Sequence, residues 1–233
     1  MRVVSLVPSI TETLLAWGVE VVACSRFCEQ PGLVHVGGTK DPDIGAIVAL
    51  APDLVVLDRE ENRREDAESL AASGLRVHAT HVTDLASLRT ALATLAATVG
   101  VRPGPPGPDL RSIDPAPTAT AIVPIWRRPW MLLGADTYGA SLLAAIGVAV
   151  LPAQSSDRYP ALDPSTFAGR VDLVLLPSEP YPFGERHIAE VAAVVPGAEV
   201  LLVDGRDLLW WGVRTPAAAQ RLSAALRPVP PSS

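Results

Sequence analysis

The sequence predicts an α/β fold with two Rossmann-like lobes, each a mostly parallel sheet flanked by helices. Segments of strand and helix character alternate along the chain, which is typical of parallel sheets. Several short patterns of the first half recur in the second half in the same order, which indicates duplicated units. Because clefts between lobes are common ligand sites, we expect a ligand to bind in the cleft between these two.

The sequence separation between each pattern and its repeat is nearly constant. Each of four segments in the first half has a counterpart in the second half: Val7-Pro8 with Val123-Pro124, Leu14–Ala16 before Gly18 with Leu142–Ala144 before Gly147, Asp53–Leu57 with Asp172–Leu176, and Val77–Leu85 with Val200–Leu208. The alternative is that buried parallel strands resemble one another because all are rich in Val and Leu. Shared order favours the duplication.

Four short apolar runs in the first half predict strands, at residues 3–7, 21–24, 54–57 and 77–80. The helices between them are predicted from residues that cap helix ends. Ser9, with Glu12 completing a capping box, begins the first helix, and Gly18 ends it. Asp43 or its neighbour is expected to begin the helix through Leu50. The expected caps of the later helices are Asn62 for a charged helix ending at Gly74 and Asp84 for a helix reaching Val99.

Three segments are predicted along the chain. Residues 1–100 form the N-terminal lobe, residues 101–117 form a linker, and residues 118–233 form the C-terminal lobe. The linker is rich in Pro and Gly, which disfavour a helix. Residues 25–42 are expected to be a long loop. The second lobe is predicted to have strands near 119–125, 172–176 and 199–203, and a last helix over 216–226.

The composition of the chain argues against two classes of protein, those that bind nucleic acid and those that span a membrane. A net charge of -6 argues against a nucleic-acid surface, and no apolar run is long enough to cross a membrane. Cys24 and Cys28 have neither a CxxC nor a zinc-site spacing, and their redox state is left open. The chain enters a strand directly after Met1, so as written it is expected in the cytoplasm, or outside it if a leader has been removed.

Candidate binding residues are aromatic and lie in loops after predicted strands, where open α/β sheets bind ligands. Trp126 and Trp130 flank two arginines, of which Arg128 is a candidate to hold an acidic group. Large rings suit a planar or conjugated ligand, although they could equally pack against their own lobe. The further candidates are Tyr159, Tyr181, Trp210, Trp211 and, as a cation in the first half, Lys40.

Catalytic signatures are lacking from the sequence. There is no GxGxxG, GxxxxGK[ST], GxSxG or HExxH motif. The pair His78 and His81 is interpreted as structural or exposed rather than as a metal site. The dense run of charges over 58–66 has i, i+4 pairs typical of an exposed helix face, with partner docking as the alternative.

The opening Val3–Glu12 with Gly18 resembles the class III, helical-backbone solute-binding proteins. The resemblance continues through Val36–Thr39 and Pro52–Val55 and returns at Asp157–Pro160. Those proteins serve ABC importers of cobalamin, haem and ferric siderophores, and the first-lobe motifs are nearest to the cobalamin-binding branch. The resemblance implies a non-catalytic binding protein with no permanently bound cofactor.

Carried over by position, the resemblance implies ligand-facing aromatic residues at Phe27, Trp130, Tyr159 and Trp210. Lys40 and Asp58 stand where cobalamin binders have aromatic residues, which makes this site more polar. The acidic residues that dock such proteins on a transporter correspond to positions near Arg64 and Ser165 here. The neighbouring Glu65 is therefore the expected docking residue.

Two other functions are kept as alternatives. The first is a cytoplasmic enzyme or chaperone that handles corrinoids or metal chelates, with Asp58 or Glu179 as a titrating group of perturbed pKa. The second is an interaction module that uses the charged face of residues 58–68. The leading prediction is the binding of a metal-containing ligand, with aromatic rings on its faces and cations at its acidic groups.

Overall fold

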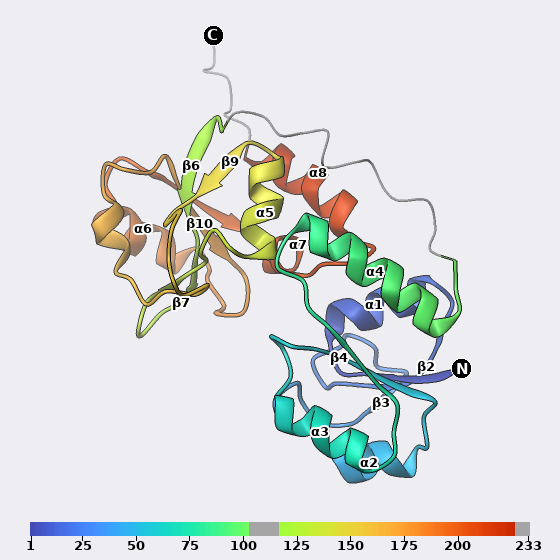
Figure 1. Cartoon of the computed structure of the whole chain (residues 1–233). Helices are drawn as coiled ribbons and strands as arrows, with labels where there is room; N and C mark the ends of the chain where they lie inside the picture. The colour runs from blue at the N-terminus through green and yellow to red at the C-terminus, as the bar shows by residue number, and fades with distance from the viewer. Residues whose placement is uncertain (103–116, 227–233) are drawn as a thin grey trace. The chain divides into compact units, whose positions relative to one another are not determined.

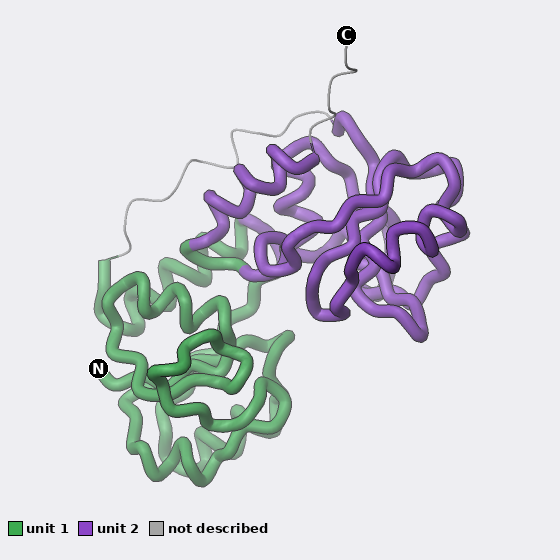
Figure 2. Tube along the Cα trace, turned by 180° about the vertical axis from the view of Figure 1, so that it is seen from behind, with its two compact units in different colours: residues 1–82, 86–106, 211–213 green, residues 83–85, 107–210, 214–233 purple. Residues whose placement is uncertain are grey.

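The computed structural model describes residues 1–102 and 117–226, which fall into two compact units. Unit 1 contains residues 1–82, 86–102 and 211–213, and unit 2 contains residues 83–85, 117–210 and 214–226 (Figure 2). Most of the predicted linker over 101–117 lies outside the described residues.

Unit 1 is built on a five-stranded parallel sheet. Its strands follow the order β3-β2-β1-β4-β5 (Figure 1). The bounds are Arg2–Ser5 for β1, Glu20–Cys24 for β2, Val34–His35 for β3, Leu54–Asp58 for β4 and Val77–Thr80 for β5. Strand β3 lies within the segment expected to be a loop, and its two residues are too few to give a pattern.

Helices cover both faces of this sheet, with α1 and α4 on one side and α2 and α3 on the other (Figure 1). Side chains alternate along each strand, so Val4 and Val55 point to the face where Ile47 of α2 and Leu70 of α3 are buried. The helix bounds are Pro8–Ala16 for α1, Ile44–Ala49 for α2, Arg64–Ala72 for α3 and Leu85–Val99 for α4.

Two of the predicted helix caps are wrong. Val7 caps α1 without a side-chain hydrogen bond, because Pro8 occupies the first turn and its fixed φ suits that position. Ser9 is therefore buried inside the helix. Asn62 does not cap α3, which begins after Arg63. Asp43 does cap α2, accepting a hydrogen bond from the Ala46 backbone N–H at 2.9 Å.

Unit 2 contains a four-stranded parallel sheet of order β11-β10-β6-β9 and a separate hairpin, β7-β8. The strand bounds are Ala119–Ile122 for β6, Pro124–Trp126 for β7, Met131–Leu132 for β8, Val148–Val150 for β9, Leu173–Pro177 for β10 and Glu199–Val203 for β11. Sequence analysis missed β8 and β9, both of which are shorter than the four residues that a strand pattern needs.

Helix α6 packs on one face of this sheet, where Val191 and Val195 join Val174 and Leu176 of β10 in a core. The other face is covered by α5, α7 and α8 (Figure 1). The helix bounds are Tyr138–Ala145 for α5, Arg186–Val194 for α6, Gly205–Leu209 for α7, Thr215–Ala225 for α8 and Pro164–Phe167 for the 3-10 helix η2. No helix in the described part of the chain has the length and apolar character to span a membrane.

The two sheets share one topology. The order β9-β6-β10-β11 repeats the order β2-β1-β4-β5 when the repeated sequence patterns are matched. Asp53 and Asp172 precede the matched strands β4 and β10. The Asp53 carboxylate accepts from the Arg2 backbone N–H at 2.7 Å, and Asp172 accepts from that of Thr120 at 2.7 Å. The predicted fold class is confirmed, and the duplicated topology supports the duplication.

Candidate ligand-binding site

A cluster of aromatic rings lies in unit 2 where β7 and β10 end. Trp126 meets Tyr181 edge-on at 5.7 Å between ring centroids, and Tyr181 meets Phe183 at 4.6 Å. Trp130 stacks on Phe183, with the ring planes 3° apart and the centroids at 6.2 Å. His187 contacts both Tyr181 and Phe183. We call these five residues the aromatic cluster.

The aromatic cluster is buried at one end and open at the other. Phe183 and His187 are buried within the α6 side of unit 2, whereas 43% of Trp126 is exposed. Trp130 and Tyr181 are half-buried. Rings that pack on one another lose little further freedom when a ligand covers them, so Trp126 presents a pre-organised apolar surface.

Arg127 connects the β7-β8 hairpin to the aromatic cluster. Its guanidinium lies 5.8 Å from the Trp130 ring centroid and forms an ion pair with Glu190 of α6. A hydrogen bond with Tyr181 raises the pKa of Arg127 further above its ordinary value. The neighbouring Arg128 is exposed and adopts the left-handed backbone region, with φ at +90°.

A group of charged side chains surrounds the ring of Trp210, which follows α7. The guanidinium of Arg206 lies 5.5 Å from the Trp210 ring centroid and that of Arg214 lies at 5.1 Å. Glu179 follows β10; burial raises its pKa, while a hydrogen bond with Trp210 and the nearby Arg206 oppose that rise. A Cβ at position 205 would lie 2.6 Å from the Glu179 backbone N, so glycine is needed there.

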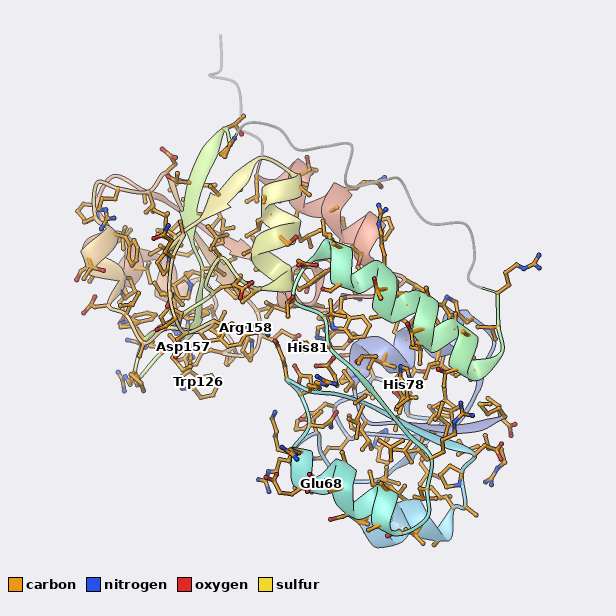
Figure 3. The ribbon with its side chains drawn as sticks, in the orientation of Figure 1. Glu68, His78, His81, Trp126, Asp157 and Arg158 are labelled. Carbon is orange, nitrogen blue, oxygen red and sulfur yellow. The ribbon has the colours of Figure 1, made fainter. Side chains whose placement is uncertain are left out.

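Tyr159 is half-buried in the loop that follows β9. The same loop and the segment between β8 and α5 form a hollow of about 440 Å³. Its lining contains two carboxylates, Asp136 and Asp157, with Ala, Ser and Gln side chains around them. Arg158 lies 3.9 Å from the Asp136 carboxylate. Figure 3 places Trp126, Asp157 and Arg158 at the same end of unit 2.

In unit 1, Phe27 is 55% exposed in the loop between β2 and β3. The Arg26 guanidinium lies 5.2 Å from the Phe27 ring centroid and donates to both carboxylate oxygens of Asp41, at 2.9 and 2.8 Å. Gly37, with φ at +89°, lies after β3 in the segment that contains Asp41, and its carbonyl accepts from the Arg26 backbone N–H at 2.8 Å. Phe27 is therefore a ring presented to solvent by an ordered loop.

Asp58 is buried at the end of β4, with 3% of its surface exposed. Its carboxylate accepts from the Thr80 hydroxyl at 2.7 Å and from the Glu60 backbone N–H at 2.9 Å. Burial raises the pKa of this carboxyl, and those hydrogen bonds oppose the rise. Asn62, predicted to be a helix cap, instead joins the Asp58 backbone N–H to the Thr39 carbonyl. These bonds give Asp58 a structural role in joining three loops.

The remaining predicted residues are scattered. Lys40 is exposed and donates to the Glu60 carbonyl. Trp211 is 7% exposed and belongs to unit 1, apart from Trp210 in unit 2. Glu65 is exposed in the first turn of α3. His78 is half-buried beside the Thr98 hydroxyl, at 3.4 Å, and burial lowers its pKa.

Sequence analysis did not select His187, Arg206 or Arg214. His187 and the arginines are found only through the fold, since they come from α6, α7 and the segment before α8. Within the described residues, no group of three or more His, Cys, Asp or Glu side chains could hold a metal ion.

Comparison with known proteins finds a family that is similar to the first part of this chain. Residues 3–102 match the family described as periplasmic binding protein. The vitamin B12-binding protein of Yersinia pestis (strain Pestoides F) is 35% identical over an alignment 95 residues long, which covers 37% of this chain and 34% of that protein. The chain thus spans about a third of the length of the curated relatives that it matches.

Solved structures match over nearly the whole chain. The periplasmic vitamin B12 binding protein BtuF of Vibrio cholerae has a TM-score of 0.77 at 18% identity, covering 97% of this chain and 96% of that one. The periplasmic haem binding protein HutB of Vibrio cholerae has a TM-score of 0.77 at 20% identity, covering 98% and 99%. The resemblance to the class III solute-binding proteins is confirmed.

At these identities the solved structures establish the fold. In this fold Trp126, Tyr181, Phe27 and Lys40 lie at or after the ends of strands, as the sequence predicted for a ligand site. Trp210 instead follows helix α7, and His187 lies within α6. Their role in binding stays a prediction, as does a cleft between the lobes.

Proposed function

We propose that this protein binds a metal-containing ligand, such as a cobalamin-like corrinoid, haem or a ferric siderophore, without changing it chemically. The observation that carries the proposal is the aromatic cluster, which exposes Trp126 above rings that are already packed. A flat conjugated ligand gains apolar burial and ring stacking there. The relatives that are named for vitamin B12 and haem support this ligand class.

Cations around the aromatic residues fit the acidic groups that such ligands carry. Arg128 is exposed beside Trp130, and Arg206 and Arg214 flank Trp210. A guanidinium binds carboxylates or phosphates through two parallel hydrogen bonds. Lys40 is the corresponding cation of unit 1. We therefore infer that the ligand has an apolar face and at least one anionic substituent.

We further infer that the protein works outside the cytoplasm as the binding protein of an ABC importer. The match to the periplasmic binding protein family supports that location and that partner. Glu65 is the proposed docking residue, since it is acidic, exposed and in the first turn of α3. It lies beside the position that the family resemblance assigned to docking.

The test is a titration of the full chain with cobalamin, cobinamide, haem and ferric chelates, followed by ligand absorbance and Trp fluorescence. One of them should bind saturably, and Trp126→Ala should weaken that binding about tenfold, the loss of about 1.4 kcal/mol expected for one stacked ring. Trp126 is the position to change because truncating Trp130 would open the packed interior of unit 2.

Trp17→Phe is the matched control, because Trp17 ends α1 in unit 1 and is not among the proposed binding residues. It should bind as the unchanged protein does. If none of the four ligands binds saturably, the proposed ligand class is wrong. If a ligand binds and Trp126→Ala has no effect, the ligand class stands and the aromatic cluster is not its site.

A further inference from the structure

The two cysteines of the chain lie together at the carboxyl end of β2. Cys24 is the last residue of that strand, and Cys28 closes the following turn, where its backbone N–H donates to the Ser25 carbonyl at 3.0 Å. The hydroxyl of Ser25, which follows Cys24 in the chain, lies 3.4 Å from the Cys28 sulfur. Both cysteines are buried, at 0% and 5% exposure, and they are not joined in a disulfide. The turn therefore returns Cys28 to the end of β2, beside Cys24.

Hydroxyl groups surround the Cys28 sulfur. The Thr11 hydroxyl of α1 lies 3.2 Å from it and the Ser25 hydroxyl lies at 3.4 Å. The Thr11 hydroxyl also lies 2.8 Å from the Ser5 hydroxyl and 2.9 Å from the Val7 carbonyl, so its single hydrogen is shared among these partners and the Cys28 sulfur. Hydroxyl donors stabilise a thiolate, which is the reactive form of cysteine. Hydrogen bonds from Cys24, Ser25 and Thr11 lower the pKa of Cys28 to about 6, against the effect of burial.

We propose that Cys24 and Cys28 form an intramolecular disulfide when the protein meets an oxidising small-molecule disulfide. The Cys28 thiolate attacks one sulfur of that reagent, forming a mixed disulfide and releasing one small thiolate. Cys24 then loses its proton and attacks the Cys28 sulfur, which releases the second small thiolate. The two cysteines are oxidised, the reagent is reduced to two thiols, and both cysteine protons leave with the products or solvent.

The roles of the two cysteines differ because their surroundings differ. Cys28 lies on the turn, contacts two hydroxyl groups and keeps a small exposed area, so it is the residue that attacks the reagent. Cys24 is fully buried in the strand, and its neighbour Cys28 raises its pKa. It therefore resolves the mixed disulfide once the turn opens, and a reagent does not reach it first.

The disulfide would fix the turn that carries Phe27. Residues 25–27 lie between the two cysteines, and Arg26 and Phe27 present the exposed ring of unit 1. A bond across this turn would restrict the loop and alter how the ring meets a ligand. This consequence depends on the proposed function, whereas formation of the disulfide does not.

The experiment equilibrates the full chain with mixtures of reduced and oxidised glutathione and stops exchange with acid. After unfolding, free thiols are counted with a maleimide and the intact mass is measured. We expect both thiols to disappear together, with a mass loss of two hydrogens and no dimer on a non-reducing gel. Cys24→Ser should instead stop at one glutathione on Cys28, and Cys28→Ser should leave Cys24 unmodified while the protein is folded.

Full labelling of both thiols after equilibration with oxidised glutathione would overturn the proposal, as would a stable glutathione adduct on the unchanged protein. Circular dichroism checks that the serine variants fold, and Cys24→Ala replaces Cys24→Ser if the buried hydroxyl destabilises β2. Because the readout needs no ligand, failure here leaves the ligand proposal intact. Slower amide exchange over residues 25–28 in the oxidised protein would support the effect on Phe27.

Discussion

Single residues in this protein divide into those that a ligand can reach and those that tie loops together. Trp126 and Phe27 are exposed, and each is supported by a neighbouring ring or guanidinium. Asp58 and Asn62 are buried, and their hydrogen bonds connect the ends of β4 and β5 with the loop that contains Thr39. A polar residue at the ligand-binding end of a strand is thus not in itself a ligand contact.

Asp58 makes stability depend on pH in a defined direction. Because burial raises its pKa above the ordinary 3.8, the folded state holds the proton that the unfolded state releases. The contribution of Asp58 to stability is fully present below 3.8 and is lost as the pH rises through the folded value, at about 1.4 kcal/mol per pH unit.

Asp58→Asn should therefore lose less stability than the unchanged protein when the pH is raised from below 3.8 to neutrality. An asparagine oxygen can still accept from Glu60, and the Thr80 hydroxyl can instead donate to the Leu57 carbonyl, which lies 3.2 Å away. Urea midpoints at several pH values measure the difference. Equal pH slopes for the two proteins would show that Asp58 titrates normally.

The candidate site was predictable where the sequence places aromatic residues directly after strands. Trp126, Trp130 and Tyr181 were found by this criterion, and they do lie in one cluster. The neighbours Trp210 and Trp211 met the same criterion but belong to different units, and Trp211 is buried. Sequence order gives the end of the sheet, whereas side-chain direction depends on packing that only the fold determines.

At the scale of elements, strands of four or five apolar residues were predictable and shorter ones were not. Strands β1, β2, β4, β5, β10 and β11 gave clear patterns, whereas β3, β8 and β9 have two or three residues each. The residue at which each helix begins depended on local contacts that the capping pattern does not show. Pro8 began α1 in place of Ser9, and the bonds of Asn62 to the Asp58 backbone and Thr39 took it away from α3.

Helix α3 carries the proposed contact with a transporter. Charge reversal in Glu65→Lys should weaken capture by the importer of the same ligand several-fold, because a contact at the rim of an interface contributes about 1 kcal/mol or less. Glu20→Lys is the matched control, since Glu20 is exposed in the same unit at the opposite, amino end of β2. Equal losses in both variants would indicate a nonspecific charge effect and contradict docking through α3.

At the scale of the whole molecule, the same supersecondary topology occurs twice, and each copy has its own hydrophobic core. The matched strands β4 and β10 are each preceded by an aspartate that accepts from the neighbouring strand, so the matched strand pairs have the same register at this end. Residues 83–85 belong to unit 2 although the residues on either side of them belong to unit 1. Residues 211–213 belong to unit 1 although the residues on either side of them belong to unit 2. The units are therefore separate in their cores and joined by the chain.

This organisation predicts that a cavity made in the core of one unit leaves the backbone amides of the other unit protected from hydrogen exchange. Leu70 is fully buried in the core of unit 1, so Leu70→Ala should cost about 3 kcal/mol. In native-state hydrogen exchange, amides of β1 and β4 should lose protection while those of β10 keep it. Leu132→Ala, at a fully buried position in the core of unit 2, should give the reverse pattern. Equal loss of protection in both units for either variant would mean that the two cores unfold as one, and that the segments 83–85 and 211–213 couple them tightly.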